Sequence, residues 1–526
     1  MRENSEQAHA STRSPLATLL FFLLLLSGAA LRLVDLERRP LHGDEAVGAY
    51  VSSTVARTGS FVYESSNRHG PFQYYVGALV MRWKGESTFW LRFPYALAGS
   101  LLILACFGFR RPFGDFGWLL SCALLSFSPI FIYYSRYAVQ EIYFLAATAL
   151  LFSCGLALAR DGRGVWLFGL LLAGAWMVTI KETFVIVWGC LAAALALGFL
   201  FGGSGFRRAV SAALALLKAR RLAGILGLLA GLLLIVTAYS DSFRDFSGLR
   251  QLAVNLASML RHGASTADAV ELHNHPAGFY APLLLRFEWL TTALAALGAW
   301  VALRWRQPRT LVLALYAFLT LLVTCALSYK TPWLILTPLL GMALLAGDGM
   351  GQLVTRRLTR APGAALLAGA CALPLLLLPQ AIQSSYSRPA DPALGLAYHH
   401  ASEAQRQLVR EIREILARVP SYSYPQVVVS LPYYWPLAWY LRKEPDVNFE
   451  SSPVPSLNPQ ELAMVPVVVT LESADPKFLK AFIGSDSVPA FSLPSHTPHR
   501  IILVPPDYMV GRVWIRNDLA NLPPSP

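Results

Sequence analysis

TFVIVWGCLAAALALGFLFG, residues 183–202, carries no charged side chain. A helix that crosses the hydrocarbon core of a membrane needs about 20 consecutive, mostly apolar residues, so this stretch predicts a spanning helix. Ten further runs meet the same criterion or nearly so: 15–34, 89–109, 117–134, 139–159, 164–180, 222–239, 284–303, 310–328, 332–348 and 363–383. The sequence therefore predicts a polytopic α-helical membrane protein with about eleven transmembrane helices.

The composition agrees with lipid as the solvent for most of the chain. Charged residues make up 14% of the 526 positions and apolar residues 55%, whereas soluble globular proteins carry roughly 25% charged residues. The net charge of +13 could indicate a nucleic-acid partner. The basic residues nevertheless fall in short clusters between apolar runs, as the loops of membrane proteins do, and this excludes nucleic acid as the expected partner.

The first apolar run could be a signal peptide or a membrane anchor, and the cysteines could be metal ligands or small core residues. Ser27-Gly28-Ala29 resembles a signal-peptide cleavage site, but the run is long for a signal peptide, so an uncleaved anchor is expected. All six cysteines lie inside apolar stretches, and no pair shows metal-ligand spacing.

The basic loops predict the orientation. They are Arg110-Arg111, Arg160 with Arg163, 207–221, 304–309 and 356–360, and they alternate with the other connections. The positive-inside rule therefore places them, with the N-terminus, on the cytoplasmic side of the cytoplasmic membrane. Loops 35–88 and 240–283, the short links near 135–140, 180–182 and 328–331, and the tail are expected outside.

The tail differs in character from the rest of the chain. Residues 393–419 have helical spacing, and short β-branched runs follow at 427–429, 467–469 and 501–504, with a helical stretch at 475–483. Strand and helix alternate, so we expect a transmembrane domain over 1–383 and a small extracytoplasmic α/β domain over 384–526.

Charged residues gather where helices are expected to emerge on the outer side. Such groups are expensive at membrane depth and are functional candidates by default. A carboxylate can accept the proton of an attacking hydroxyl, and Lys or Arg can neutralise a leaving phosphate. The candidate carboxylates for the chemistry are Asp44, Glu45 and Glu141, and the candidate binding residues are His42, Arg136, Lys181, Glu182 and Lys330.

Each candidate also has a simpler interpretation. Asp44 and Glu45 could be a helix cap or a solvated loop start, and the cations could bind lipid head groups or extend to the membrane interface. His273-Asn274-His275 could be a metal pair or a plain loop. The aromatic segment 433–440 could stack on a sugar or dock the tail on the membrane surface, or it could serve in packing.

Six short motifs are spread over most of the chain in this order: His42-Gly43-Asp44-Glu45-Ala46-Val47, His69-Gly70-Pro71-Phe72-Gln73-Tyr74-Tyr75, Ser135-Arg136-Tyr137, Lys181-Glu182, Tyr329-Lys330-Thr331-Pro332-Trp333, and Tyr434-Trp435-Pro436-Leu437 with Trp439-Tyr440. As a set they resemble the C-fold (GT-C) membrane glycosyltransferases, which include the protein O-mannosyltransferases and the aminoarabinose transferase of lipid A. More closely they resemble a prokaryotic family of flippase-activity-associated membrane proteins.

The resemblance implies a polyprenyl-phosphate-sugar donor and inverting transfer outside the cytoplasmic membrane. It implies that Asp44 is the base, with Glu45 beside it, and that Glu141 is a second acid. The sequence departs from the pattern there, because Gln140-Glu141 stands where related chains often have Asp.

The first hypothesis is therefore a glycosyltransferase whose acceptor is a hydroxyl of a lipid, glycan or protein. A different class is a flippase, or a flippase-associated protein, that moves a lipid-linked sugar without breaking a bond. A scaffold whose tail binds envelope partners is a third. Catalysis needs an acid placed for proton transfer and translocation does not, so the Asp44-Glu45 pair favours the enzyme. The sequence leaves open the cofactor, the sugar and the acceptor; a divalent metal is possible but is not indicated by any motif.

Overall fold

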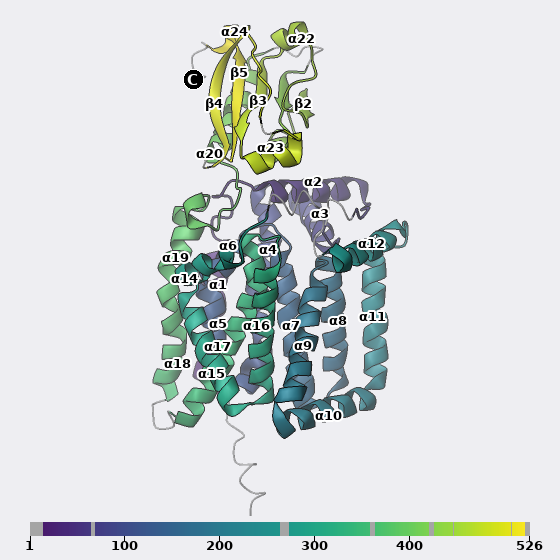
Figure 1. Ribbon diagram of the computed structural model, residues 1–526, viewed down its shortest axis with the longest axis vertical. Coiled ribbons are helices and arrows are strands. Elements are labelled where there is room, and N and C mark those ends of the chain that lie inside the picture. Colours follow the sequence, from purple (N-terminus) through teal and green to yellow (C-terminus); the bar gives the residue numbers. More distant parts are fainter. Residues whose placement is uncertain are drawn as a thin grey trace, which may run out of the picture.

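The computed structural model describes residues 14–64, 69–262, 273–357, 363–419, 425–444, 446–485, 487–505 and 508–520. Long helices form a bundle, and a smaller sheet domain stands on one end of it (Figure 1). We call that end of the bundle the upper end and the opposite end the lower end.

The bundle is built from the apolar runs. Its long helices are α1 (Pro15–Leu33), α4 (Thr88–Ala105), α5 (Arg110–Phe127), α7 (Glu141–Asp161), α8 (Gly164–Ile180), α9 (Phe184–Phe201), α11 (Arg221–Tyr239), α15 (Trp289–Trp305), α16 (Pro308–Ala326), α17 (Leu336–Arg357) and α18 (Gly363–Ala372), which continues through η5 (Leu373–Leu377), α19 (Leu378–Ile382) and the π-turn η6 (Gln383–Ser387). Local signals set several ends. Ser14 caps α1 ahead of Pro15, and Gly162, at φ 61°, ends α7.

Eight helices of the described chain are long and apolar enough to span a membrane, or nine if Ala277–Phe287 and Trp289–Trp305 form one bent span. One of the eight, Thr88–Phe127, has 40 residues. At 1.5 Å per residue that is about 60 Å, twice the thickness of the hydrocarbon core.

The chain reverses inside this long span, so it counts as two helices. Gly114 has non-helical φ and ψ of 71° and 166°. A Cβ on Gly28 of α1 would touch both Ile103, before the break, and Ser126, after it. Helix α8 misses the length criterion because it has 17 residues. With α4 and α5 separated, and with α8 and the bent pair included, each of the eleven apolar runs is accounted for by a helix.

Shorter helices lie at the two ends of the bundle (Figure 1). At the upper end are α2 (Gly43–Thr58), α3 (Phe72–Lys84), α6 (Pro129–Ser135), α12 (Ser247–His262), η3 (Ala277–Tyr280), α14 (Ala281–Phe287) and η4 (Pro332–Ile335), and α10 (Gly203–Ala219) lies at the lower end. The segment 35–88, expected as an outer loop, therefore contains two helices. A further turn, η2 (Cys106–Phe109), joins α4 to α5.

The C-terminal domain is the α/β unit that the sequence predicts. Its five strands are β1 (Val427–Ser430), β2 (Val447–Glu450), β3 (Val467–Ala474), β4 (His496–Val504) and β5 (Met509–Arg516), in the order β2-β1-β3-β5-β4. Strand β1 is parallel to β2 and β3, and β5 is antiparallel to β3 and β4. Alternate residues of β1 and β3 enter two separate apolar clusters, so both faces of the sheet are covered.

The helices of this domain are α20 (Glu403–Leu416), α21 (Leu437–Tyr440), α22 (Pro459–Met464), α23 (Pro476–Ile483) and α24 (Asn517–Ala520), and η7 (Pro392–Leu394) precedes them. The expected helix over 393–419 is wrong at its start. Positive φ values at Gly395 (74°) and His399 (49°) interrupt it, and Ser402 caps the helix that follows. The division of the chain at 383/384 stays a prediction.

Candidate active site at the upper end of the bundle

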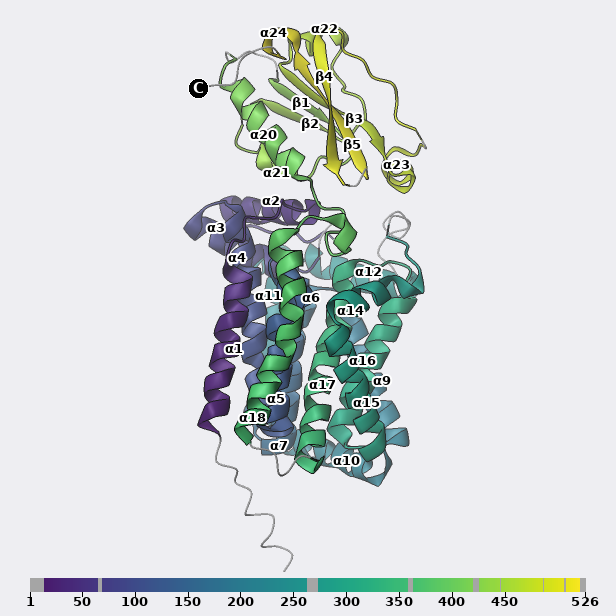
Figure 2. The same cartoon turned by 90° about the vertical axis from the view of Figure 1, so that its left-hand side faces the viewer.

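The candidate residues come from links that meet at the upper end of the bundle, beneath the C-terminal domain (Figure 2). Five links contribute. They are the connection from α1 to α2, the link before α3, and the turns between α6 and α7, between α8 and α9, and between α16 and η4. Residues distant in the sequence are thereby brought to one level of the molecule.

Glu45 lies at the centre of a buried polar network and is fully shielded from solvent. Its two carboxylate oxygens accept from Nε and Nη2 of Arg92, both at 2.7 Å. They also accept from the backbone N–H of His42 and of Ala138, at 3.0 and 2.8 Å. Burial acts to raise the pKa of Glu45, but the charges of Arg92 and Arg39 and these hydrogen bonds lower it to about 2. Glu45 is thus a fixed anion whose acceptor positions are occupied.

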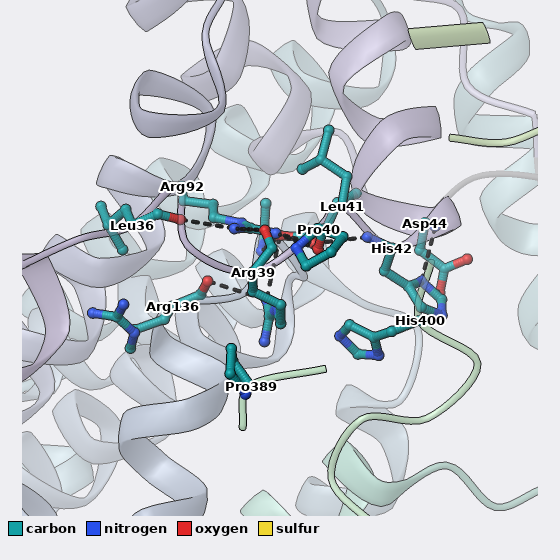
Figure 3. A network of polar contacts seen from close by, with 12 residues as sticks. Leu36, Arg39, Pro40, Leu41, His42, Asp44, Arg92, Arg136, Pro389 and His400 are labelled. Atoms are coloured by element: carbon teal, nitrogen blue, oxygen red, sulfur yellow. Dashed lines mark hydrogen bonds and ion pairs between the residues drawn. The ribbon is translucent and has the colours of Figure 1, made fainter. Parts of the chain in front are cut away.

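Arg92 shapes the link that leads to α2. Besides Glu45, its guanidinium donates to the carbonyl oxygens of Leu36, Arg39 and Pro40, at 2.7, 2.8 and 3.0 Å (Figure 3). Because α4 holds this side chain, the link is folded around a buried cation, and the start of α2 is fixed.

Asp44 differs from its neighbour Glu45 in exposure. It lies in the first turn of α2, where the helix dipole favours a negative charge, and 55% of its side chain is exposed. Nδ1 of His42 accepts the backbone N–H of Asp44 at 3.0 Å and lies 3.7 Å from its carboxylate. Burial is the main cause that lowers the pKa of His42, so this cap is a neutral imidazole at pH 7. Asp44 is therefore the member of the acidic pair that is open to a substrate.

The C-terminal domain contacts the start of α2 and the link that precedes it. A Cβ on Gly43 would lie 1.9 Å from the hydroxyl oxygen of Tyr433, so only glycine leaves room for that tyrosine. The hydroxyl of Tyr440 accepts the backbone N–H of Leu41 at 2.8 Å. Trp435 packs on Tyr50 of α2 with ring centroids 5.6 Å apart. The aromatic segment therefore docks the domain on the bundle, as its packing interpretation predicts.

Glu141 and Lys181 form a buried ion pair between the two neighbouring links. The pair uses Oε1 of Glu141, and no described residue provides a hydrogen bond to its Oε2. The adjacent Glu182 accepts from the imidazole of His69 at 3.0 Å. Two acid–base pairs thus stand side by side on consecutive residues of one link.

Lys330 is held by backbone oxygens. Its ammonium group donates to the carbonyl of His275 at 2.8 Å and to that of Leu327. A bridge between Asn274 and Tyr329 joins the same two segments. Burial raises the pKa of Tyr329, and the charges of Asp44, Glu141 and Glu182 act in the same direction. Acids from three separate links therefore act on one tyrosine.

The contacts of Arg136 differ from those expected of a phosphate ligand. Its guanidinium donates to the carbonyls of Val34 and Asp35, at 2.5 and 2.7 Å, where α1 ends, and it lies 4.3 Å from the ring centre of Tyr386. In Figure 3 the side chain points away from Asp44. The geometry favours an anchor for the end of α1 over a phosphate ligand.

Two buried arginines of the site were missed in the sequence. Arg92 lies inside an apolar run, and a charge in such a run is a signal that could have identified it. Arg39 lies between the rings of Tyr133 and Tyr137, at 4.8 and 4.7 Å, and no described residue accepts from its Nε. Arg39 and Arg92 share one carboxylate, that of Glu45, so the centre of the network carries an excess of positive charge.

The two histidines that precede η3 contact one tyrosine. Nδ1 of His273 and Nε2 of His275 both contact the hydroxyl of Tyr398, at 2.8 and 2.9 Å. No group of three or more potential metal-binding side chains occurs within the ranges that the structure describes.

The chain is similar to a known enzyme family in part of its sequence and to solved membrane-protein structures in its fold. Residues 68–240 match the family model for dolichyl-phosphate-mannose-protein mannosyltransferase, and no curated protein matches the chain. The structure is similar to that of ArnT from Cupriavidus metallidurans in the apo state, with 15% identity, a TM-score of 0.57, and coverage of 94% of this chain and 97% of ArnT. ArnT bound to undecaprenyl phosphate gives 16% identity, the same TM-score and the same coverage.

The oligosaccharyltransferase of Archaeoglobus fulgidus in its apo form is also similar, with 14% identity, a TM-score of 0.56, and coverage of 88% of this chain and 70% of that one. At these identities the likeness shows a shared fold, and the coverage of ArnT extends it over nearly the whole chain, including the C-terminal domain.

Proposed function

We propose, from the C fold of membrane glycosyltransferases that this chain has, that it transfers a sugar from a polyprenyl-phosphate donor to an acceptor hydroxyl at the upper end of the bundle. The observation that carries the proposal is the division of labour in the acidic pair. Glu45 is buried and saturated, and it fixes the helix start that presents the exposed Asp44. A carboxylate so placed suits a general base.

The proposed reaction is a single displacement. The carboxylate of Asp44 accepts the proton of the acceptor hydroxyl, whose oxygen bonds to the anomeric carbon as the bond from that carbon to the phosphate oxygen breaks. The configuration at the anomeric carbon is thereby inverted. The leaving polyprenyl phosphate gains charge in this step, so a cation near it stabilises the transition state more than the ground state.

Lys181 and Lys330 are the proposed phosphate ligands. Both are buried among the links that hold Glu141 and Tyr329. Lys330 uses two of its three N–H groups on carbonyls, and the third is available to an anion. In this proposal Glu141 positions Lys181, and Glu182 with His69 orders the link that carries it.

The similarity to ArnT bound to undecaprenyl phosphate supports a lipid-linked donor, and the family model supports a phosphate-linked sugar. The extracytoplasmic location of the site follows from the basic lower loops and stays part of the proposal. The sugar, the acceptor class and the resemblance to flippase-associated proteins stay predictions.

The test separates transfer from translocation. The purified protein is reconstituted in vesicles with polyprenyl-phosphate sugars and an envelope extract from a strain that lacks the protein. Free polyprenyl phosphate and lipid movement between leaflets are measured separately, for the native chain and for Lys181→Ala and Lys330→Ala. The proposal predicts release of carrier phosphate that depends on the extract and is lost in both variants. Translocation without release, abolished by the same substitutions, would instead establish the flippase.

A further inference from the structure

A long apolar groove opens on the side of the bundle between α4, α7 and α8. Its volume is about 800 Å³. The large apolar side chains of α4 that line it, Leu97, Leu101 and Leu104, are 41–47% exposed. They recur at helical spacing, so they form one stripe. The groove is therefore open sideways to the hydrocarbon core.

The two ends of the groove differ in charge. At the upper end it is lined by Phe72, Tyr143 and Trp176, none of which is charged at pH 7. At the lower end it is lined by Arg110, Arg111, Arg160 and Asp161. An amphiphile that follows the groove would therefore place an anionic head at the lower end.

Two of the three arginines that line the lower end are neutralised within the protein. Arg160 forms paired bonds with Asp161, both at 2.6 Å, and Arg110 is paired with Asp115 at 2.7 Å. Arg111, by contrast, has no ion-pair partner among the described carboxylates.

Arg163, which precedes α8, likewise has no described carboxylate as ion-pair partner. Arg111 lines the mouth itself, and Arg163 follows Asp161, which also lines it, by two residues. Arg220 adds a third cation there, since its Nε donates to the carbonyl of Gly162 at 2.7 Å.

We propose that this groove binds an anionic phospholipid of the leaflet at the lower end, with its phosphate at Arg111 and Arg163 and an acyl chain along α4 and α7. Basic pockets between membrane helices on the cytoplasmic side are suited to anionic head groups. The uncharged upper end and the apolar walls do not suit passage of a phosphate from one leaflet to the other. The site is separate from the proposed transfer chemistry and does not rest on it.

The head-group contact is tested by native mass spectrometry of the purified full chain with phosphatidylglycerol or phosphatidylcholine. Each surface arginine contributes about 1 kcal/mol to the attraction of an anionic lipid, or about fivefold in affinity. Phosphatidylglycerol should be retained over phosphatidylcholine, and Arg111→Gln with Arg163→Gln should weaken its retention about 25-fold. Arg208→Gln, on the exposed face of α10 at the same end, is the matched control and should change little.

The chain contact is tested by filling the groove. Leu150→Trp, on the groove wall, should lower retention of phosphatidylglycerol, whereas Leu229→Trp on the lipid-facing side of α11 should not. Equal retention of the two phospholipids, or retention unchanged in the double arginine variant, would overturn the proposal. Polyprenyl phosphate that displaces phosphatidylglycerol and is insensitive to the arginine changes would assign the groove to the donor chain instead.

Discussion

Asp44→Asn and Glu45→Gln alter adjacent carboxylates, yet the first should reduce activity without loss of stability, and the second should reduce stability. Glu45 is fully buried and bonded to Arg92 through both oxygens. Removing one partner of such a pair costs about 3–5 kcal/mol, because the other charge stays buried without compensation. Asp44 is more than half exposed, so its substitution should change stability by no more than about 0.5 kcal/mol.

Activity, in contrast to stability, should depend directly on Asp44 and only indirectly on Glu45. Loss of a general base lowers the rate by about 10²- to 10⁴-fold, so Asp44→Asn should remain folded and nearly inactive. Asp35→Asn is the matched control, because Asp35 is an exposed carboxylate of the same link whose ion-pair partner among the described residues is the exposed Arg38. Thermal unfolding in detergent, followed by tryptophan fluorescence, is measured beside release of polyprenyl phosphate from vesicles.

Two results would refute this reasoning. Transfer by Asp44→Asn at a tenth or more of the native rate would remove the base assignment. An unfolding temperature for Glu45→Gln equal to that of the native chain would show that the buried network does not hold the site. Either result is readable without knowledge of the acceptor, provided that the native chain releases carrier phosphate.

Further predictions concern the cation, the pH dependence and the topology. Lys330→Ala should lower kcat more than it raises KM, measured by initial rates over a range of donor concentrations, and Lys330→Arg should recover part of the loss because the charge returns. Burial opposes the charge on His69, but Glu182 raises its pKa above the usual value. The stabilisation from this pair should be complete below about pH 6.5 and disappear as pH rises through the raised pKa. Because His69 is partly exposed, Glu182→Gln should cost less than about 1 kcal/mol at pH 6, and still less at pH 9, where the neutral imidazole keeps only its hydrogen bond to the carboxylate, in thermal unfolding. Reporter fusions after Arg306 and after Pro392 should report opposite sides of the membrane, and identical reports would contradict the proposed orientation.

The helices of the bundle could be predicted because lipid imposes a simple rule on the sequence. A spanning segment must satisfy its own backbone and face an apolar solvent, so each helix shows as a run of about 20 apolar residues. Helices α2 and α3 lie at the upper end of the bundle and need no such run. Helix α2, with Asp44, Glu45 and two serines among its 16 residues, gave no apolar signal, and the segment was expected to be a loop.

The site residues could be located but not given roles. Asp44 and Glu45 are equivalent in sequence, and only burial separates them. Arg136 belongs to the link between α6 and α7, but a sequence does not show which way a long side chain turns. Its guanidinium binds the carbonyls of Val34 and Asp35, just after the end of α1. Arg92 was hidden by the hydropathy of its run. Its importance comes from contacts with residues 47 to 56 positions away.

The link before Asp44 shows why the two domains have to be considered together. It is a turn followed by irregular backbone without a strand partner, so its polar groups need bonds from elsewhere. Arg92 of α4 takes the carbonyls of Leu36, Arg39 and Pro40, while Arg406 of the C-terminal domain takes those of residues 37 and 38, at 3.1 and 2.8 Å. The hydroxyl of Tyr440, also in the C-terminal domain, accepts the backbone N–H of Leu41. Five consecutive carbonyls are thus divided between a membrane arginine and an arginine of the C-terminal domain. The position of the proposed base therefore depends on the docking of that domain as much as on the bundle.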